Sequence, residues 1–302
     1  REGAEQPRSA AMEESVDLAH TLFIVSSKSG GTTEPNVMKD YFFDRVSKTI
    51  GKDKAGHRFI AVTDPGSSLQ KVATRQGFAR IFYGDPTIGG RYSVVSPFGL
   101  VPAAAAGIDV RSLITHALAM VRSCGADVPP HENPGVQLGL AMGLAGLEGR
   151  DKVTISSSPK VADFGAWAEQ LIAESTGKDG KGLIPIDGEP LGDPSLYGND
   201  RFFIDLRVEG DDDASHNDRL SALEAAGHPV VRIVMKSVHH IGQEFFRWEI
   251  ATAVAGIVIV AFIAASAVAA GWAAIDRLLH PADVSYLGAV AGAAVFGFLG
   301  NE

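Results

Sequence analysis

The amino-acid sequence predicts an α/β fold with two doubly wound lobes, each built on a parallel sheet, followed by a hydrophobic helical hairpin. Short runs of β-branched and aromatic residues alternate with helical patterns along most of the chain. A segment rich in proline and asparagine, ADVPPHENPG (126–135), separates two such series. Further on, Ile250 to Ile275 contains no charged side chain. We therefore divide the chain into residues 1–125, 126–256 and 257–302.

In the first lobe, nearly continuous apolar runs predict parallel strands that are buried on both faces. The expected strands are TLFIVSS (21–27), RFIAVTD (58–64) and ARIFYGD (79–85). A helix from about Asn36 to Val46 follows the first strand, and a helix that carries Leu69, Val72 and Ala73 follows the second. Because ligands bind at the carboxyl ends of such strands, the segment SKSGGTTE after the first strand is the candidate binding site.

The second lobe repeats this alternation after the linker. The expected strands are 152–158, 182–187, 201–208 and 230–235, and the expected helices are 136–147, 161–174 and 215–226. The acidic segment DDDASHND (211–218) lacks the spacing of an EF-hand, so we expect a solvated turn that leads into a helix capped by Ser215.

The apolar tail predicts membrane association through residues 250–300. As a helix, the charge-free run would be about 39 Å long, which is enough to cross a bilayer. After the interruption DRLLHPAD, a second uncharged run extends from Val284 to Gly300, near the lower limit for spanning.

Composition narrows the function classes. The chain has 302 residues, of which 45% are hydrophobic and 21% charged, as in a folded protein with room for two domains. The net charge of −9 argues against a nucleic-acid partner, which normally meets clustered lysine and arginine. Cys124 is the one cysteine, so no intrachain disulfide can form, and a reducing compartment is favoured. We expect the polar part in the cytoplasm, because residues 1–20 lack the apolar core of a signal peptide.

The residues from Ser26 to Thr33 form a loop of hydroxyls, glycines and one lysine between a buried strand and a helix start. Such a loop offers backbone N–H groups, hydroxyl donors and the positive end of the helix dipole to an anion, and a phosphate monoester fits it. The pattern G-x-x-x-x-G-K-[ST] is absent, which argues against a nucleotide. A Ser/Thr-rich turn that caps a helix with Glu34 in its first turn is the alternative, and the residues alone leave both open.

Three segments together resemble one family. VSSKSGGTTEPN (25–36) resembles the phosphate loop of the sugar isomerase (SIS) domain of glucose-6-phosphate isomerases. GGRYSVVSPFGL (89–100) and QLIAESTGKDGKG (170–182) are similar to the Gly-Gly-Arg and Glu-Ser-x-Gly-Lys segments of that family. The resemblance covers residues from about 20 to 256. With GQEFFRWEIATAVAG (242–256) included, the sequence is most similar to the isomerase part of bifunctional transaldolase/glucose-6-phosphate isomerase proteins.

The resemblance implies an enzyme that interconverts glucose 6-phosphate and fructose 6-phosphate through an enediol(ate), without a metal or a redox cofactor. It implies that Arg91 stabilises the enediolate, that Glu174 moves the proton between C2 and C1, and that Gln170 faces the same cleft. The implied phosphate ligands are Ser27, Lys28, Ser29 and Thr32. The family commonly completes its site as a homodimer. Taken singly, a residue such as Glu174 is more often a solvated helix-end carboxylate, and one such as Arg91 is more often part of a surface ion pair. Only their combination favours the catalytic roles.

The chain departs from the family pattern in three places. Glu244 follows Gly-Gln where the family has its ring-opening histidine, so Glu244, His239 or His240 is the candidate for that role, unless the two histidines are only strand-end residues near solvent. The Gly-rich turn that precedes the phosphate loop has no counterpart in the first 20 residues, and the C-terminal Lys-bearing segment is missing. We expect a truncated first lobe and impaired activity. The alternative is a sugar-phosphate-binding remnant without catalysis, against which the retained Glu174 argues.

The tail from about Ile257 is similar to the third and fourth membrane helices of cation diffusion facilitator transporters, including RLLHP and the closing GFLGNE. Asp276, His280 and Asp283 lie in the connection, where a hydrated loop is favoured over a zinc site. The chain thus resembles two unrelated gene fragments joined near Gly256, whether by biology or by an assembly error.

Overall fold

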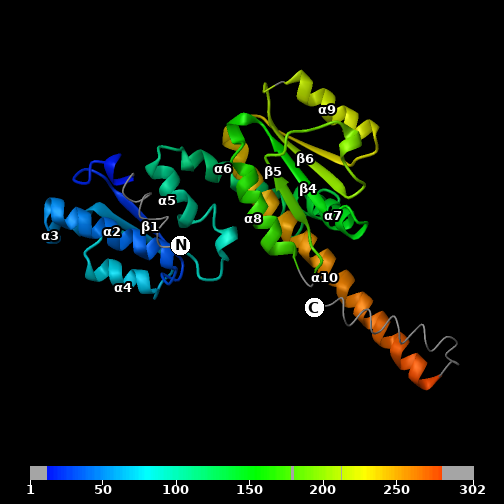
Figure 1. Ribbon diagram of the computed structural model, residues 1–302, viewed down its shortest axis with the longest axis horizontal. Helices are drawn as coiled ribbons and strands as arrows, with labels where there is room; N and C mark the ends of the chain where they lie inside the picture. The colour runs from blue at the N-terminus through cyan, green and yellow to red at the C-terminus, as the bar shows by residue number, and fades with distance from the viewer. Residues whose placement is uncertain (1–11, 178–179, 212, 281–302) are drawn as a thin grey trace.

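The computed structural model describes residues 12–177, 180–211 and 213–280, and it shows an α/β protein with two parallel sheets (Figure 1). The first sheet has the strand order β1-β2-β3, and the second has the order β5-β4-β6-β7. All strand pairs within the described residues are parallel. The predicted fold class is therefore confirmed.

The first lobe forms around aromatic side chains. Its elements are β1 (Phe23–Ser26), α2 (Thr33–Ile50), α3 (Lys52–Ala55), β2 (Phe59–Thr63), α4 (Ser68–Arg75) and β3 (Arg80–Tyr83). The Phe23 ring stacks on the rings of Phe42 and Phe59, with both centroid separations at 5.0 Å. Because Phe23 and Phe59 are partners in the β1–β2 register and Phe42 comes from α2, this stack fixes the helix against the sheet. It thereby fixes the loop between β1 and α2.

The second lobe is larger, and helices cover both faces of its sheet. Its elements are α7 (Pro134–Leu147), β4 (Lys152–Ser157), α8 (Phe164–Thr176), β5 (Ile184–Asp187), β6 (Arg201–Val208), α9 (Ala214–Ala225) and β7 (Val230–Met235). Helix α9 begins one residue earlier than expected, and its N-cap is Asp213, whose side chain accepts from the His216 N–H, so the expected cap at Ser215 is wrong.

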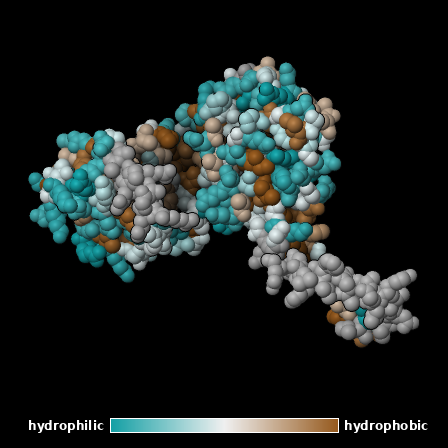
Figure 2. All heavy atoms as spheres, in the orientation of Figure 1, coloured by the Kyte–Doolittle hydropathy of each residue, from teal (hydrophilic) through white to brown (hydrophobic). Residues whose placement is uncertain are grey.

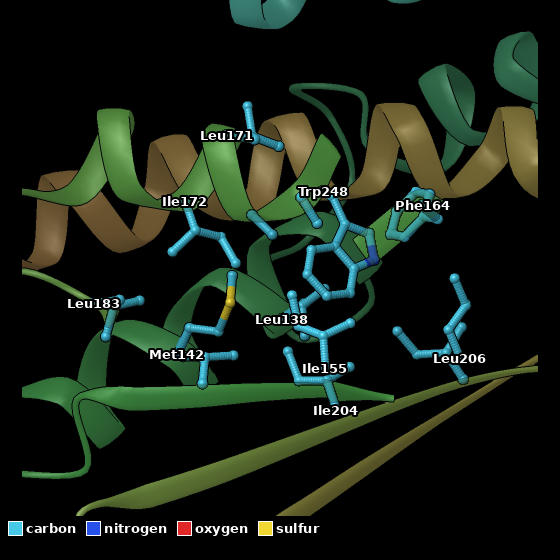
Figure 3. Close-up of a cluster of buried hydrophobic side chains, with 14 of the residues drawn as sticks. Leu138, Met142, Ile155, Phe164, Leu171, Ile172, Leu183, Ile204, Leu206 and Trp248 are labelled. Atoms are coloured by element: carbon cyan, nitrogen blue, oxygen red, sulfur yellow. The ribbon is translucent and has the colours of Figure 1, made fainter. Parts of the chain in front are cut away.

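Helix α10 (Ile241–Leu279) supplies the centre of the second-lobe core. Figure 3 shows Trp248 of α10 among Leu138 and Met142 of α7 and side chains of α8, β4 and β6. Trp248 is fully buried, and its ring meets Phe164 edge-on at 5.3 Å. The charge-free run is therefore only part of a longer helix, which begins before the run. The first half of α10 packs into the hydrophobic core of the second lobe.

Helices α7 and α10 pack closely because one face of α7 carries glycine at every fourth position. These glycines are Gly135, Gly139 and Gly143. A Cβ atom on Gly139 would lie 2.5 Å from the carbonyl oxygen of Ala251, and one on Gly143 would lie 3.0 Å from Cβ of Val258. Any larger residue would push the two helices apart.

Two helices that the sequence analysis did not predict connect the lobes: α5 (Pro97–Ala105) and α6 (Val110–Ser123). Helix α6 packs against α10 and the short helix η5 (Val238–His240), although the expected division assigned it to residues 1–125. Figure 2 shows hydrophobic residues over α5, beside the hollow between the lobes, whereas the outer face of the first lobe is mostly hydrophilic.

Beyond Ile263, α10 projects away from the lobe (Figure 1). Helix α10 continues through Gly256 without a break, so the division expected there falls inside one helix. Side chains on the projecting part are open to solvent, as at Val268 and Trp272, which are 73% and 75% exposed. Within the described residues this is the one helix long and apolar enough to cross a membrane. The second uncharged run, 284–300, lies outside the described residues.

Candidate active site

The candidate phosphate loop, residues 27–32, lies between the carboxyl end of β1 and the start of α2. Gly30 has a φ angle of +71°, and a Cβ atom there would lie 2.3 Å from the Leu69 nitrogen, so the loop requires glycine at this position. The Ser27 hydroxyl accepts from the Gly30 N–H at 3.2 Å, and the Ser29 hydroxyl accepts from the Gly31 N–H at 3.1 Å. Each hydroxyl keeps its own O–H bond as a donor for an anion.

The N-terminus of α2 faces the same loop. Thr32 is the N-cap residue, and its side chain makes no capping hydrogen bond in the described structure. The first N–H groups of a helix have no partners inside the helix, so those of α2 keep their capacity to bind an anion. Asn36 instead donates from its side chain to the carbonyl oxygens of Gly30 and Thr32, which fixes the loop on the helix. In the described structure Thr32 therefore does not cap α2 with its side chain, and the phosphate loop stays a prediction.

Lys28 is directed toward the ends of β2 and β3. Its ammonium group lies 2.9 Å and 3.1 Å from the two carboxylate oxygens of Asp64, and it donates to the carbonyl oxygen of Asp85 at 3.0 Å. The ring of Phe98 lies 5.4 Å from the same nitrogen. Lys28 is thus an ion-paired residue in this structure.

Arg91, Glu174 and Gln170 come together across the two lobes. Arg91 lies on the short helix η2 (Gly90–Tyr92), and its guanidinium donates to Glu174 Oε2 at 3.1 Å. The other carboxylate oxygen, Oε1, accepts from the Gln170 side-chain amide at 3.2 Å. Both oxygens of Glu174 are therefore held, while 48% of its side chain stays exposed to solvent and to any substrate.

Two residues that the sequence analysis missed complete this cluster. The Ser175 hydroxyl accepts from Arg91 Nε at 2.9 Å, and Tyr92 makes a 2.8 Å hydrogen bond to the same hydroxyl. Each is the chain neighbour of a predicted residue, which is the signal that could have identified it. The arrangement offers one carboxylate and one fixed cation side by side, as proton transfer with a developing oxyanion requires.

Glu244 does not join this cluster. It lies in the first turn of α10 and is buried, whereas Ser175 contacts α10 near Gly256, three turns or roughly 18 Å further along the helix. Burial raises the pKa of the Glu244 carboxyl, and the Arg247 guanidinium 3.4 Å away opposes that rise. The sequence could not show this, because the expected helix began after Glu244.

His239 and His240 lie just beyond β7, in η5. The ring of His240 lies 4.1 Å from that of His116 of α6, and its Nδ1 atom lies 3.0 Å from the Ser237 hydroxyl. Burial, and then the neighbouring His116, lower the pKa of His240. The two histidine rings, tilted by 49° to each other, pack α6 against the second lobe. Among the described residues, no hydrogen bond or ring contact joins His240 to the Arg91 cluster.

A cavity of about 670 Å³ lies between the lobes. Among the described residues, His239 is the one candidate site residue in its lining. Phe164, Trp167 and Phe245 form its aromatic part. The one lysine in its lining, Lys160, is paired with Asp211. The described lining of the cavity thus has no unpaired lysine to bind a phosphate, and the cluster of Arg91, Glu174 and Gln170 remains the better candidate for the active site.

The residues of the zinc alternative lie at the far end of α10. Asp276 and His280 form an exposed pair at 3.1 Å. Asp283, the third of them, lies outside the described residues. Within residues 12–280, apart from the short gaps, no group of three or more potential ligands is placed to hold a metal ion.

Residues 8–184 match the family model described as phosphoglucose isomerase. The glucose-6-phosphate isomerase of Parabacteroides distasonis is 35% identical over 161 residues, which are 53% of this chain and 36% of that protein. That of Lactobacillus helveticus is 38% identical over 163 residues, again 53% of this chain and 36% of that protein. The match therefore spans about a third of the length of these relatives.

Two solved structures share the fold. A hypothetical protein from Thermus thermophilus aligns with a TM-score of 0.71 and 22% identity, over 82% of this chain and 69% of that one. A glucose-6-phosphate isomerase from Chlamydia trachomatis aligns with a TM-score of 0.65 and 19% identity, over 96% of this chain and 65% of that one. At this identity the likeness concerns the fold alone.

Proposed function

Because the chain belongs to the phosphoglucose isomerase family, we propose that it interconverts glucose 6-phosphate and fructose 6-phosphate through an enediol(ate) intermediate. The observation that supports this most directly is the 3.1 Å contact between Arg91 and Glu174 across the two lobes. Aldose–ketose isomerisation needs one carboxylate within reach of both carbons, and a cation where the oxyanion develops. These two side chains are of the required types and are adjacent.

In this proposal the loop residues bind the phosphate and the cluster carries out the proton transfer. Ser27, Ser29 and Thr32, with the loop backbone around Lys28, hold the sugar phosphate. Glu174 removes the proton from C2 and returns it to C1, Gln170 keeps its carboxylate in orientation and contacts substrate, and Arg91 stabilises the enediolate oxygen. Glu244 has no part in it, because that carboxyl is buried three turns away on α10.

A coupled assay tests the proposal: glucose 6-phosphate formation from fructose 6-phosphate is measured on the full chain. Glu174→Gln is expected to lower turnover by about 10²-fold or more, because the amide cannot accept the proton. Glu169→Gln changes an exposed glutamate of the same helix and is expected to keep wild-type turnover. Equal turnover of the Glu174→Gln variant and the wild type would rule out Glu174 as the base.

The same measurement separates catalysis from the second candidate, a binding remnant. Only 36% of each of these two relatives is matched, so their activity is not carried over to this chain by the match alone. A wild-type chain without turnover, whose thermal midpoint still rises with 5-phosphoarabinonate, would be a sugar-phosphate-binding protein. The retained Glu174 and Arg91 favour the enzyme, because binding alone needs no base.

We propose further that the chain works as a homodimer in the cytoplasm. The support is the resemblance to a family that commonly completes its site between two subunits. Sedimentation equilibrium of the full chain in mild detergent tests the mass, with a monomer as the contradicting outcome. Fractionation of the source cells tests the compartment.

Membrane association through residues 250–300 is a separate proposal, which is supported by the exposed apolar side chains of α10 beyond Ile263. Flotation of the full chain with phosphatidylcholine vesicles tests it. The double variant Val268→Asp/Trp272→Asp changes two exposed positions and is expected to abolish flotation without changing the thermal midpoint. Flotation unchanged by both charges would assign binding to another surface.

We also propose that residues 20–256 derive from a transaldolase-fused isomerase, and residues 257–302 from a cation diffusion facilitator transporter. The segment GQEFFRWEIATAVAG supports the first origin by its resemblance to such isomerases, and the segments RLLHP and GFLGNE support the second by their resemblance to such transporters. Amplification of genomic DNA across the codon of Gly256 tests the junction. Failure to recover one continuous product would show that the join is an assembly error.

A further inference from the structure

Lys28 connects the candidate phosphate loop with the segment that carries Arg91. The carbonyl oxygen of Asp85 accepts from Lys28 Nζ at 3.0 Å and from the Ile88 N–H at 3.2 Å. The Asp85 carboxylate accepts from the N–H and the hydroxyl of Thr87, so Asp85 is the centre of a tight turn. This turn leads directly into η2 and Arg91.

The position of Lys28 is set in turn by Asp64, at the carboxyl end of β2. The backbone N–H of Asp64 donates to the Lys28 carbonyl oxygen at 3.1 Å, and both carboxylate oxygens of Asp64 lie within 3.1 Å of the Lys28 ammonium. The side chains are 25% and 17% exposed, so the pair is shielded enough to be stronger than a surface ion pair. A Cβ atom on Gly84 would lie 2.9 Å from Asp64 Oδ1, which shows how closely the chain fits around it.

Lys28 directs its ammonium group to protein oxygens. It donates hydrogen bonds to Asp64 Oδ1 and to the carbonyl oxygen of Asp85, and Asp64 Oδ2 lies 2.9 Å away as an ion-pair contact. Two of the three N–H bonds of the ammonium are therefore donated to Asp64 and Asp85. Loop hydroxyls and backbone N–H groups would bind the phosphate, and Lys28 would act through the turn.

We propose that Asp64 is a positioning residue, which holds Lys28 on the Asp85 turn and so sets the place of Arg91 relative to the phosphate loop. The inference rests on the proposed function for its catalytic consequence, but its structural part does not. In a simpler model, Lys28 binds phosphate directly and Asp64 only competes for Lys28. The two models predict different effects of Asp64→Asn on the affinity for phosphate.

Amide hydrogen exchange of the ligand-free full chain tests the structural part. Asp64→Asn and Lys28→Met are each expected to accelerate exchange at residues 87–92 by about tenfold or more, the size expected for loss of a charge-assisted hydrogen bond. Asp64→Glu is expected to restore part of the protection. Asp44→Asn removes an exposed ion pair with Lys48 in the same lobe and should leave these amides unchanged. Unchanged exchange at residues 87–92 in both variants would overturn the proposal, whether or not the chain is active.

Calorimetric titration with inorganic phosphate and with fructose 6-phosphate distinguishes the two models, because it measures how Asp64→Asn changes the affinity for phosphate. If Asp64 positions Lys28, Asp64→Asn keeps the phosphate affinity within about twofold and lowers turnover about tenfold or more, a loss in kcat without a matching rise in KM. If Asp64 only competes for Lys28, Asp64→Asn frees the ammonium and phosphate binds more tightly, which would overturn the proposal. A wild type that binds neither probe would refute the proposed function, and the exchange result would still decide the role of Asp64.

Discussion

At the scale of single residues, Arg91 makes contacts that a lysine cannot reproduce. Its Nε atom donates to Ser175 while another guanidinium nitrogen donates to Glu174, so one planar group holds two partners on α8. We expect Arg91→Lys to lower turnover about 10²-fold, because a point charge on a flexible stem loses that geometry. The coupled assay measures it, and Arg75→Lys, an exposed change in α4, serves as the control. A variant as active as the control would contradict the role of the planar contact.

Glu249 of α10 gives a pH dependence with a definite sign. Burial raises the pKa of Glu249 to about 8, from an ordinary value of 4.5. Between these values the folded protein binds more protons than the unfolded chain, so the free energy of unfolding decreases as pH rises through this window. Glu249→Gln removes this loss. It is therefore expected to be more stable than the wild type near pH 8, with a difference that shrinks toward about pH 5.

Urea unfolding at several pH values measures this difference, and Glu169→Gln provides the exposed match. A stability difference that stayed constant with pH would show that Glu249 does not titrate in the folded protein.

Charged residues within a largely apolar helix, such as Glu244 and Glu249, are where the sequence was hardest to interpret. Their spacing suits either a solvated helix or a packed one, and only the tertiary contacts decide.

The predicted residues divide according to the information they needed. Ser27, Ser29 and Thr32 follow a buried strand directly, so local pattern was enough to place them in one loop. Glu174 and Arg91 are far apart in sequence, and residue chemistry alone left each compatible with a surface role. The family resemblance paired them, and the 3.1 Å contact is what the structure adds. The pairing of Lys28 with Asp64 depends on strand order, which no local pattern specifies.

At the scale of elements, the α7–α10 contact depends on glycine. Gly139→Ala should gain about 1 kcal/mol from helix propensity, but the added Cβ atom would meet Ala251 O at 2.5 Å and Val254 Cβ at 2.7 Å. Overpacking of this kind costs about 1–3 kcal/mol or more, so we expect a net loss of stability. The same change at Gly271, where nothing lies within 4 Å, should cause no loss. Urea midpoints compare the two variants. Equal midpoints would show that the helices move apart without cost.

The elements themselves were predicted in part. All seven strands of the described structure lie at or within two residues of their expected positions. The central strands β2, β4 and β6 are mostly buried and leave nearly continuous apolar runs, whereas the edge strands β3 and β5 contain no buried residue and were found from their β-branched and aromatic residues. Helices α5 and α6 were missed, although Val110, Leu113, Ile114 and Ala117 of α6 have helical spacing. Helix α10 was expected too late, because its first turns carry charges and its amphipathic start was interpreted separately from the apolar run.

At the scale of the whole molecule, α6 decides how the chain divides. It follows the first lobe in sequence, yet it packs on α10 and η5. We expect its amide protection to follow the second lobe. Met142→Ala, in the second core, should lower the stability there by about 2–5 kcal/mol and speed exchange in α6. Phe42→Ala, in the first core, should leave α6 unchanged. The reverse pattern would assign α6 to the first lobe.

The length of α10 outside the core also limits its role in a membrane. From Ala264 to Ile275 the projecting uncharged part is about 18 Å long, whereas the hydrocarbon core of a bilayer is about 30 Å thick. A complete crossing would have to draw Ile259 and its neighbours out of the second-lobe core. Contact with one leaflet requires no such loss.

The continuity of α10 has a consequence for how the chain is made. Residues 241–263 leave the ribosome well over a hundred residues after α6, a delay on the order of 10 s at about 5–20 residues per second. During that interval the glycine face of α7 and the apolar face of α6 have no partner. The nascent chain therefore needs protection from aggregation until α10 is released, even though the first lobe has by then had time to fold.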